Sequence, residues 1–106
     1  MSNTGNVYRL SAAAAKDIND IYDYTIDRFG EQQAVKYLTG LDERLAFLAE
    51  YPDTGRTRDE VRKGLMSLVY QKHVVFYRVM QYGIRIVRVL HGSMDVPKQF
   101  GIKNPS

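Results

Sequence analysis

The spacing of the apolar residues changes once along this chain, and that change limits the folds open to it. Before residue 51, apolar residues recur at helical spacing in two stretches that one glycine, Gly30, separates. After residue 64 they alternate with a period of two, as in β-strands. Two helices joined by one glycine must fold back on each other, so the first half predicts a tight antiparallel helical hairpin.

The boundaries of the hairpin follow from its capping residues. Ser11 is a good N-cap for the first helix, and Gly30 ends it because glycine tolerates positive φ. The second helix begins near Glu31 and stops before Pro52. The residues expected on the buried stripes are Ala14, Ile18, Ile21, Tyr22, Thr25 and Phe29 in the first helix, and Ala34, Tyr37, Leu38, Leu41, Leu45 and Leu48 in the second.

Four segments are predicted to be strands. One precedes the hairpin at 6–10, and three follow a polar loop at 51–64; these three are 65–70, 73–80 and 84–91. The order β-α-α-β-β-β predicts an α+β fold in which the helical hairpin packs on one face of a small antiparallel sheet. We expect a single domain over 6–100, a flexible N-terminus at 1–5 and a flexible tail at 101–106.

Both faces of the last strand pair are apolar. With Met80 opposite Ile84, one face carries Val74, Phe76, Arg78, Met80, Ile84, Ile86, Arg88 and Leu90, and the other carries His73, Val75, Tyr77, Val79, Arg85, Val87, Val89 and His91. A sheet with one solvated face would alternate cleanly between apolar and polar residues. The hairpin can cover only one face, so a partner, a second copy or the C-terminal segment must cover the other.

Composition narrows the functional classes. Cysteine is absent, which excludes disulfides, a thiol nucleophile and a thiolate zinc site. No apolar run could span a membrane and the first residues are polar, so we expect a cytoplasmic protein without membrane contact. Residues 1–50 carry five basic and eight acidic residues, whereas residues 51–106 carry ten basic and four acidic ones. The basic second half indicates an acidic partner, nucleic acid or protein, or else a solvated surface.

Several stretches in a fixed order resemble one family. They are YRLSAAAAKDINDIYDYTIDRFG at the start, the P-D-x-G of Pro52, Asp53 and Gly55, then KGL at 63–65, VVFYRV at 74–79 and IRIVRVLHGSMD at 84–95. From Val7 to about Phe100 the chain resembles the ParE toxins of the RelE/ParE toxin–antitoxin superfamily. That resemblance implies inhibition of DNA gyrase and neutralisation by a ParD-type antitoxin. It also raises the alternative of the RelE-type relatives, which cut messenger RNA on the ribosome.

The residues favour a binding protein over a ribonuclease. Metal-free RNA cleavage needs a proton donor, a proton acceptor and cations. Where RelE-type relatives carry such groups, this chain has Val74, Met94 and Phe100. His91 could act as an acid or base, and it is expected opposite His73, but the simpler interpretation makes it the last residue of a strand. We therefore expect no catalytic residue, no cofactor and no metal, since the two histidines lack a third ligand.

The remaining candidates are binding residues. For the target these are Arg62, Arg78, Arg85, Arg88, His91, Lys98 and Phe100, and for the antitoxin they are Tyr24, Val35, Phe47, Val75, Tyr77 and Val89. Sequence-specific binding to nucleic acid by the chain alone is not expected. ParE toxins commonly carry arginine where this chain has Met66 and Met94. A weakened toxin that serves mainly as an antitoxin-binding module is therefore a further alternative.

Overall fold

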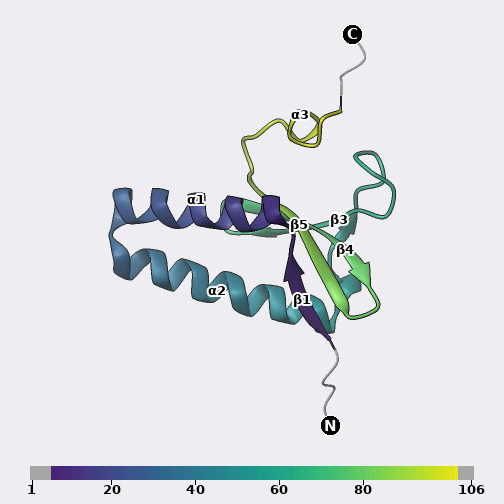
Figure 1. Ribbon diagram of the computed structural model, residues 1–106, viewed down its shortest axis with the longest axis horizontal. Helices are drawn as coiled ribbons and strands as arrows, with labels where there is room; N and C mark the ends of the chain where they lie inside the picture. Colours follow the sequence, from purple (N-terminus) through teal and green to yellow (C-terminus); the bar gives the residue numbers. More distant parts are fainter. Residues whose placement is uncertain (1–5, 103–106) are drawn as a thin grey trace.

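The computed structural model describes residues 6–102, which form two helices against one sheet (Figure 1). The elements are β1 (Val7–Leu10), α1 (Ala12–Phe29), α2 (Glu31–Glu50), a 3-10 turn η1 (Pro52–Thr54), β2 (Arg56–Thr57), β3 (Met66–Tyr70), β4 (His73–Met80), β5 (Gly83–His91) and α3 (Val96–Gln99). The predicted α+β class and its β-α-α-β-β-β order are confirmed. The sequence patterns missed η1, β2 and α3, which are too short to show a period.

The helical hairpin forms as its caps predict. The Ser11 hydroxyl accepts a hydrogen bond from Ala14 N at 2.9 Å, and Gly30 has φ 91° between the helices. Figure 1 shows α1 and α2 side by side on one side of the sheet. Most of the predicted stripe is buried or half-buried, with Ala14, Ala34, Leu41, Leu45 and Leu48 fully enclosed. Phe29 was expected in the core, but it is 64% exposed because it is the last helical residue, beyond the reach of the sheet.

The sheet is mixed, not purely antiparallel. Its strand order is β1-β5-β4-β3-β2, and β1 runs parallel to β5 with Val7 beside Gly83. The close approach at this point needs a glycine, because a Cβ on Gly83 would lie 2.0 Å from the Val7 carbonyl oxygen. The sequence pattern could not show that the first strand lies at an edge of the sheet, beside the last one.

The predicted register was wrong at the turn between β4 and β5. Met80 lies opposite Gly83, and an irregularity between Phe76 and Tyr77 restores the pairing of His73 with His91. Ile84 and Ile86 therefore lie on the helical side with Val75, Tyr77 and Val89 in one core. Arg85 correspondingly lies on the other side of the sheet, which we call the second face. A shift of one residue in strand register moves every side chain to the opposite face. The two-residue alternation of apolar residues does not reveal a β-bulge, so the shift could not be predicted from the sequence.

The second face has its own core. It is formed by Val61, Leu65, Phe76, Leu90 and Phe100. The loop at 58–65 and the segment from Asp95 to Ile102, which we call the tail segment, cover it. The C-terminal segment was one of the three covers expected. Gly101 N and Ile102 N donate to Lys98 O and Pro97 O, so these two residues continue the tail segment, and the flexibility expected of 101–106 stays a prediction. Residues 1–5 and 103–106, also expected to be flexible, lie outside the described range.

Candidate functional site

A broad groove of about 1450 Å³ opens between the helical hairpin and one end of the sheet. Its walls come from α1, α2, the turn between β3 and β4, and the residues after β5. Tyr24 and Met94 expose apolar surface there, whereas Val89 at its base is buried. Of the exposed aliphatic and aromatic candidates, Tyr24 lines the groove, and Val35 and Phe47 do not. The groove is lined by both polar and apolar side chains, and its size suits a segment of a partner protein that folds as it binds.

Three hydrogen-bonding side chains meet at the end of this groove. The Tyr37 hydroxyl lies 2.6 Å from His73 Nδ1, and the rings of His73 and His91 meet edge to face with centroids 5.5 Å apart. Burial lowers the pKa of His73, and the neighbouring His91 lowers it further. Burial likewise raises the pKa of Tyr37, with a smaller contribution from Tyr70. Near neutral pH this arrangement holds an uncharged His73 as a structural group.

His91 lies at the exposed rim and bonds locally. Its Nδ1 is 2.8 Å from Ser93 Oγ and accepts a hydrogen bond from Ser93 N at 3.1 Å. The sequence interpretation placed it at the end of a strand, and it is the last residue of β5. Among residues 6–102, no group of three or more His, Cys, Asp or Glu side chains is arranged to hold a metal ion.

Arg88, predicted to bind the target, is engaged within the fold. Its Nε and Nη2 donate to the two carboxylate oxygens of Asp17 at 2.8 and 2.9 Å, and its Nη1 donates to Gln99 O at 3.2 Å. Asp17 also accepts from Val89 N at 2.9 Å. The Asp17 pair raises the pKa of Arg88 further, so its charge is permanent. Arg88 thus joins α1, β5 and the tail segment.

Phe100 and Arg62, two more target candidates, contact each other. Phe100 is buried against Phe76 with ring centroids 5.2 Å apart, and the Arg62 guanidinium lies 5.0 Å from the Phe100 ring centroid. Arg62 Nη2 also donates to Phe100 O at 3.1 Å. Phe100 therefore offers no surface to a target in this conformation, and Arg62 helps to hold it. Both residues fasten the tail segment over the second face.

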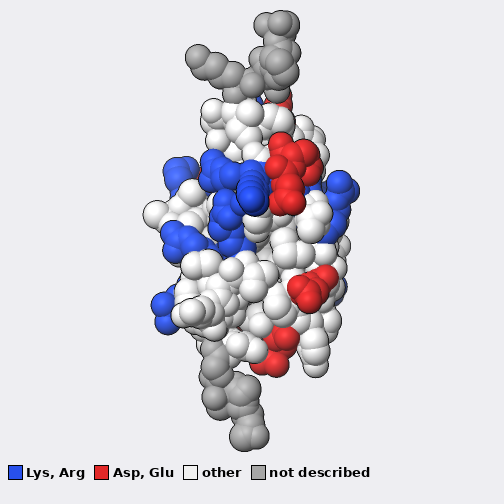
Figure 2. All heavy atoms as spheres, turned by 90° about the vertical axis from the view of Figure 1, so that its right-hand side faces the viewer, with Lys and Arg blue, Asp and Glu red and all other residues white. Residues whose placement is uncertain are grey.

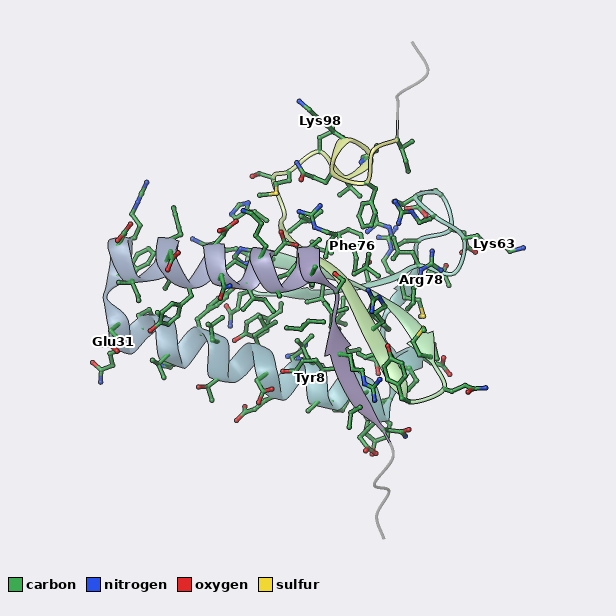
Figure 3. The ribbon with its side chains drawn as sticks, viewed as in Figure 1. Tyr8, Glu31, Lys63, Phe76, Arg78 and Lys98 are labelled. Carbon is green, nitrogen blue, oxygen red and sulfur yellow. The ribbon has the colours of Figure 1, made fainter. Side chains whose placement is uncertain are left out.

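The other target candidates remain accessible. Arg85 and Lys98 are exposed, and Arg78 is half-buried with Nη1 donating to Lys63 O at 2.8 Å. Lys98 projects from α3 away from the sheet, while Arg78, on the central strand β4, lies on the same side of the molecule as Lys63 (Figure 3). The target candidates therefore divide between residues that hold the tail segment and residues that face solvent.

Three antitoxin candidates are interior residues. Val75, Tyr77 and Val89 were expected on a sheet face that the helices leave free, but theirs is the face that the helices cover, and they are 0%, 0% and 3% exposed. Their burial leaves them unavailable to a partner, so these assignments are corrected. Tyr24, Val35 and Phe47 expose 56%, 50% and 46% of their surface. Phe47 packs against Tyr51 with the two rings tilted by 41° and their centroids 4.9 Å apart.

The P-D-x-G motif is explained by Tyr77. The Tyr77 hydroxyl donates to Pro52 O at 2.6 Å and accepts from Gly55 N at 3.0 Å, which fixes the turn after α2. A Cβ on Gly55 would lie 2.4 Å from that hydroxyl, so the glycine makes room for it. The motif therefore belongs to the fold, where it anchors the loop that leads to the second face.

Comparison with known proteins now decides the family. The model of the family described as ParE toxin of type II toxin-antitoxin system, parDE, matches residues 8–96. The chain belongs to the ParE toxin family. Toxin ParE1 of Mycobacterium tuberculosis is 44% identical over 92 residues, covering 86% of this chain and 94% of the relative. Toxin ParE1 of Caulobacter vibrioides is 40% identical over 96 residues, covering 89% and 97%.

Solved structures agree on the fold of this ParE-family chain. A chromosomal ParDE toxin–antitoxin system from P. aeruginosa superposes with a TM-score of 0.70 at 22% identity, covering 84% of this chain and 98% of that one. The toxin–antitoxin complex RelBE2 from Mycobacterium tuberculosis gives 0.52 at 20% identity, covering 83% and 99%. The resemblance seen in the sequence is thereby confirmed at the level of family and fold.

Asp17 is the functional-site residue that sequence reasoning missed. It lies in the first helix beside Ile18, on the apolar stripe, where a carboxylate is out of place without a partner. This carboxylate on the apolar stripe was the signal in the sequence that could have identified Asp17. β1 ends at Leu10, so beyond this point the edge of β5 has no neighbouring strand. Ser11 and α1 supply hydrogen-bond partners there instead. The Ser11 hydroxyl donates to Val87 O at 2.8 Å, and Asp17 accepts from Val89 N.

Proposed function

We propose that this ParE-family toxin inhibits DNA gyrase in the cytoplasm by binding it, and that a ParD-type antitoxin neutralises the toxin. The family match over residues 8–96 carries this proposal. Among the described residues no helix is long and apolar enough to cross a membrane. Gyrase and its DNA lie in the cytoplasm, so the toxin must act there.

The arrangement of side chains supports binding without catalysis. RNA cleavage requires free cations beside a proton donor and acceptor. Arg88 is committed to Asp17, Phe100 is buried, and His91 bonds Ser93. Val74 is half-buried next to the second core and carries no titratable group. We infer that the toxin works as a protein inhibitor, not as a ribonuclease of the RelE type.

The groove supports the antitoxin part of the proposal. Antitoxin segments that fold on a partner need an apolar surface to order them. The groove offers Tyr24 and Met94 as exposed apolar side chains, beside the polar pair Tyr37 and His73. A ParD-type antitoxin would thereby occupy the helical side and leave the second face free.

Binding of the purified antitoxin tests this placement. Tyr24→Ala in the groove is expected to weaken antitoxin affinity by about tenfold or more, because exposed tyrosines at interfaces are frequent hot spots. Val35→Asn is the matched control, since Val35 is an equally exposed apolar residue of the same hairpin outside the groove. Equal losses in the two variants, or a loss confined to Val35→Asn, would remove the groove from the proposal.

Expression in growing cells separates the two toxin classes. A gyrase inhibitor halts growth with loss of negative supercoiling in a reporter plasmid, while messenger RNA stays intact. Cleaved messenger RNA with unchanged plasmid topology would overturn the proposal in favour of a RelE-type ribonuclease. Normal growth and unchanged topology would instead identify a weakened toxin that acts mainly as an antitoxin-binding module.

A further inference from the structure

Three arginines stand in a row across three adjacent strands. In the sheet register Arg9 of β1 lies beside Arg85 of β5, and Arg85 lies opposite Arg78 of β4. Neighbouring strands are about 4.8 Å apart, so the outer two backbone positions are about 10 Å apart. We call these residues the arginine row. They come from distant parts of the sequence, and only the parallel β1–β5 pairing and the corrected β4–β5 register bring them together.

All three side chains point to the second face. Their sequence neighbours Tyr8, Ile84 and Tyr77 pack in the core beneath the helices, and side chains alternate along a strand. The Tyr8 hydroxyl donates to Asp42 of α2 at 2.5 Å, which fixes the inward direction in β1. Arg78 Nη1 donates to Lys63 O in the loop over the second face. The row therefore lies on one surface, away from the antitoxin groove.

The fold leaves these charges unneutralised. Within residues 6–102, the ion pairs at 4.0 Å or less are Lys16–Asp20, Arg58–Glu60 and Arg88–Asp17, none of which involves the row. Arg9 is steadied by the Tyr82 ring, whose centroid lies 4.3 Å from its guanidinium carbon. Like charges directly opposite each other on a sheet are destabilising. Three of them in line, without a carboxylate partner, indicate an anionic ligand.

The distribution of charge around the arginine row also indicates an anionic ligand. Seen from the right-hand side of Figure 1, Lys and Arg side chains gather at the middle of the molecule with an acidic cluster among them (Figure 2), on the side where Figure 3 labels Arg78 and Lys63. Residues 12–50, which form the helical hairpin, carry eight acidic and four basic residues. The molecule is thus positive on the sheet side and negative on the hairpin side, which orients it toward a polyanion.

We propose that the arginine row binds the phosphodiester backbone of nucleic acid directly, without the aid of a protein target. A duplex carries one phosphate per strand for about every 3.4 Å of helix axis, so a row of about 10 Å spans roughly three phosphates. Arginine forks bind phosphate oxygens in bidentate fashion. Evenly spaced charges match a repeating backbone, whereas an acidic protein segment would need an apolar anchor as well. Such a contact depends on the phosphate charge and not on the base sequence of the nucleic acid.

Fluorescence anisotropy with the full-length toxin, free of antitoxin and gyrase, tests this proposal. The probes are a short labelled DNA duplex, a labelled single-stranded RNA and a labelled polyglutamate peptide, titrated between about 50 and 200 mM salt. The triple variant Arg9→Gln, Arg78→Gln, Arg85→Gln removes the row. Its control is Lys16→Gln, Arg28→Gln, Lys36→Gln, which removes the same charge from the helical hairpin. Thermal melting confirms that both variants fold.

The expected results are specific. The unchanged toxin binds nucleic acid with a logarithmic salt slope of about −2.7 on duplex DNA, as three phosphate contacts require. The row variant loses about tenfold or more in affinity and most of that slope, whereas the control keeps both. The duplex and RNA arms show which nucleic acid it prefers. Because gyrase is absent, failure here leaves the proposed inhibition of gyrase untouched.

Three outcomes would overturn it. If both triple variants lost the same affinity for nucleic acid, binding would depend only on the net charge of the protein and not on the arginine row. Binding of polyglutamate as tight as that of nucleic acid would assign the row to an acidic protein partner. Absence of binding to either nucleic acid at the lowest salt would remove the site altogether, whatever the variants do.

Discussion

At the scale of single residues, Gly40 shows why a glycine is retained in the middle of α2. A Cβ there would lie 2.2 Å from the Tyr70 hydroxyl, which donates to Tyr37 O at 3.0 Å. Gly40→Ala should therefore destabilise the fold by about 1–3 kcal/mol through overpacking, although alanine is the better helix former. Chemical denaturation measures the change.

The double variant Gly40→Ala, Tyr70→Phe tests that cause. Without the hydroxyl, the nearest ring atom would lie 3.3 Å from the new methyl group, so the two changes should be clearly non-additive. Tyr70→Phe alone should cost about 1 kcal/mol for the lost hydrogen bond. Strictly additive losses would show that the hydroxyl is not what excludes a side chain at position 40.

His73 gives the fold a pH dependence whose sign follows from its lowered pKa. Burial, followed by the neighbouring His91, depresses the pKa of His73 in the folded state, whereas the unfolded chain titrates near its ordinary value of about 6.5. The unfolded state therefore binds the proton more readily. The stability contributed by neutral His73 is complete above pH of about 6.5 and falls as the pH drops toward the folded pKa.

The measurement is the free energy of unfolding between pH of about 7.5 and 5, with His73→Gln as the comparison. Glutamine can still meet the Tyr37 hydroxyl but does not titrate, so this variant should have the flatter profile. Asp17 and His91 also face the site and remain in both proteins. The account of His73 is contradicted if the two profiles have the same slope.

At the scale of elements, the tail segment is the part of the fold that the second face depends on. Phe100 packs on Phe76 and is held by Arg62, so Phe100→Ala should cost about 3 kcal/mol and expose the second core. Lys98→Ala, on the exposed side of α3, is the control and should change stability by less than about 0.5 kcal/mol. Thermal melting and binding of a hydrophobic dye measure both effects. Equal stability of the two variants would show that the tail segment only rests on the sheet.

The elements also show what the sequence could predict. Period and caps located both long helices and four of the five strands, because those signals are local. The parallel return of β1, the bulge in the last hairpin and the short α3 depend on contacts between distant segments, and no local pattern encodes them. The slip at Gly83 alone moved Ile84, Ile86 and Arg85 to the wrong faces. The arginine row went unseen for this reason, because the slip put Arg85 on the opposite face from Arg78. Val75, Tyr77 and Val89 were taken for binding residues for another reason, since the strand pattern does not show which face the helices cover.

At the scale of the whole molecule, the sheet divides two kinds of surface. The helical side carries most of the acidic residues and the groove with Tyr24, where we place the antitoxin. The second face carries the tail segment and the arginine row. A toxin arranged in this way can keep its basic face on a target while its other side remains free for the neutralising partner. The two surfaces therefore predict two separable classes of variant. Changes in the groove weaken antitoxin binding, and changes on the second face weaken toxicity.

The most direct measurement for the central claim is a supercoiling assay with purified gyrase, relaxed plasmid and the full-length toxin, scoring both supercoiled and cleaved plasmid. Our account predicts that the toxin blocks supercoiling and that stoichiometric ParD-type antitoxin restores it. Complete supercoiling in the presence of a large molar excess of folded toxin would contradict it.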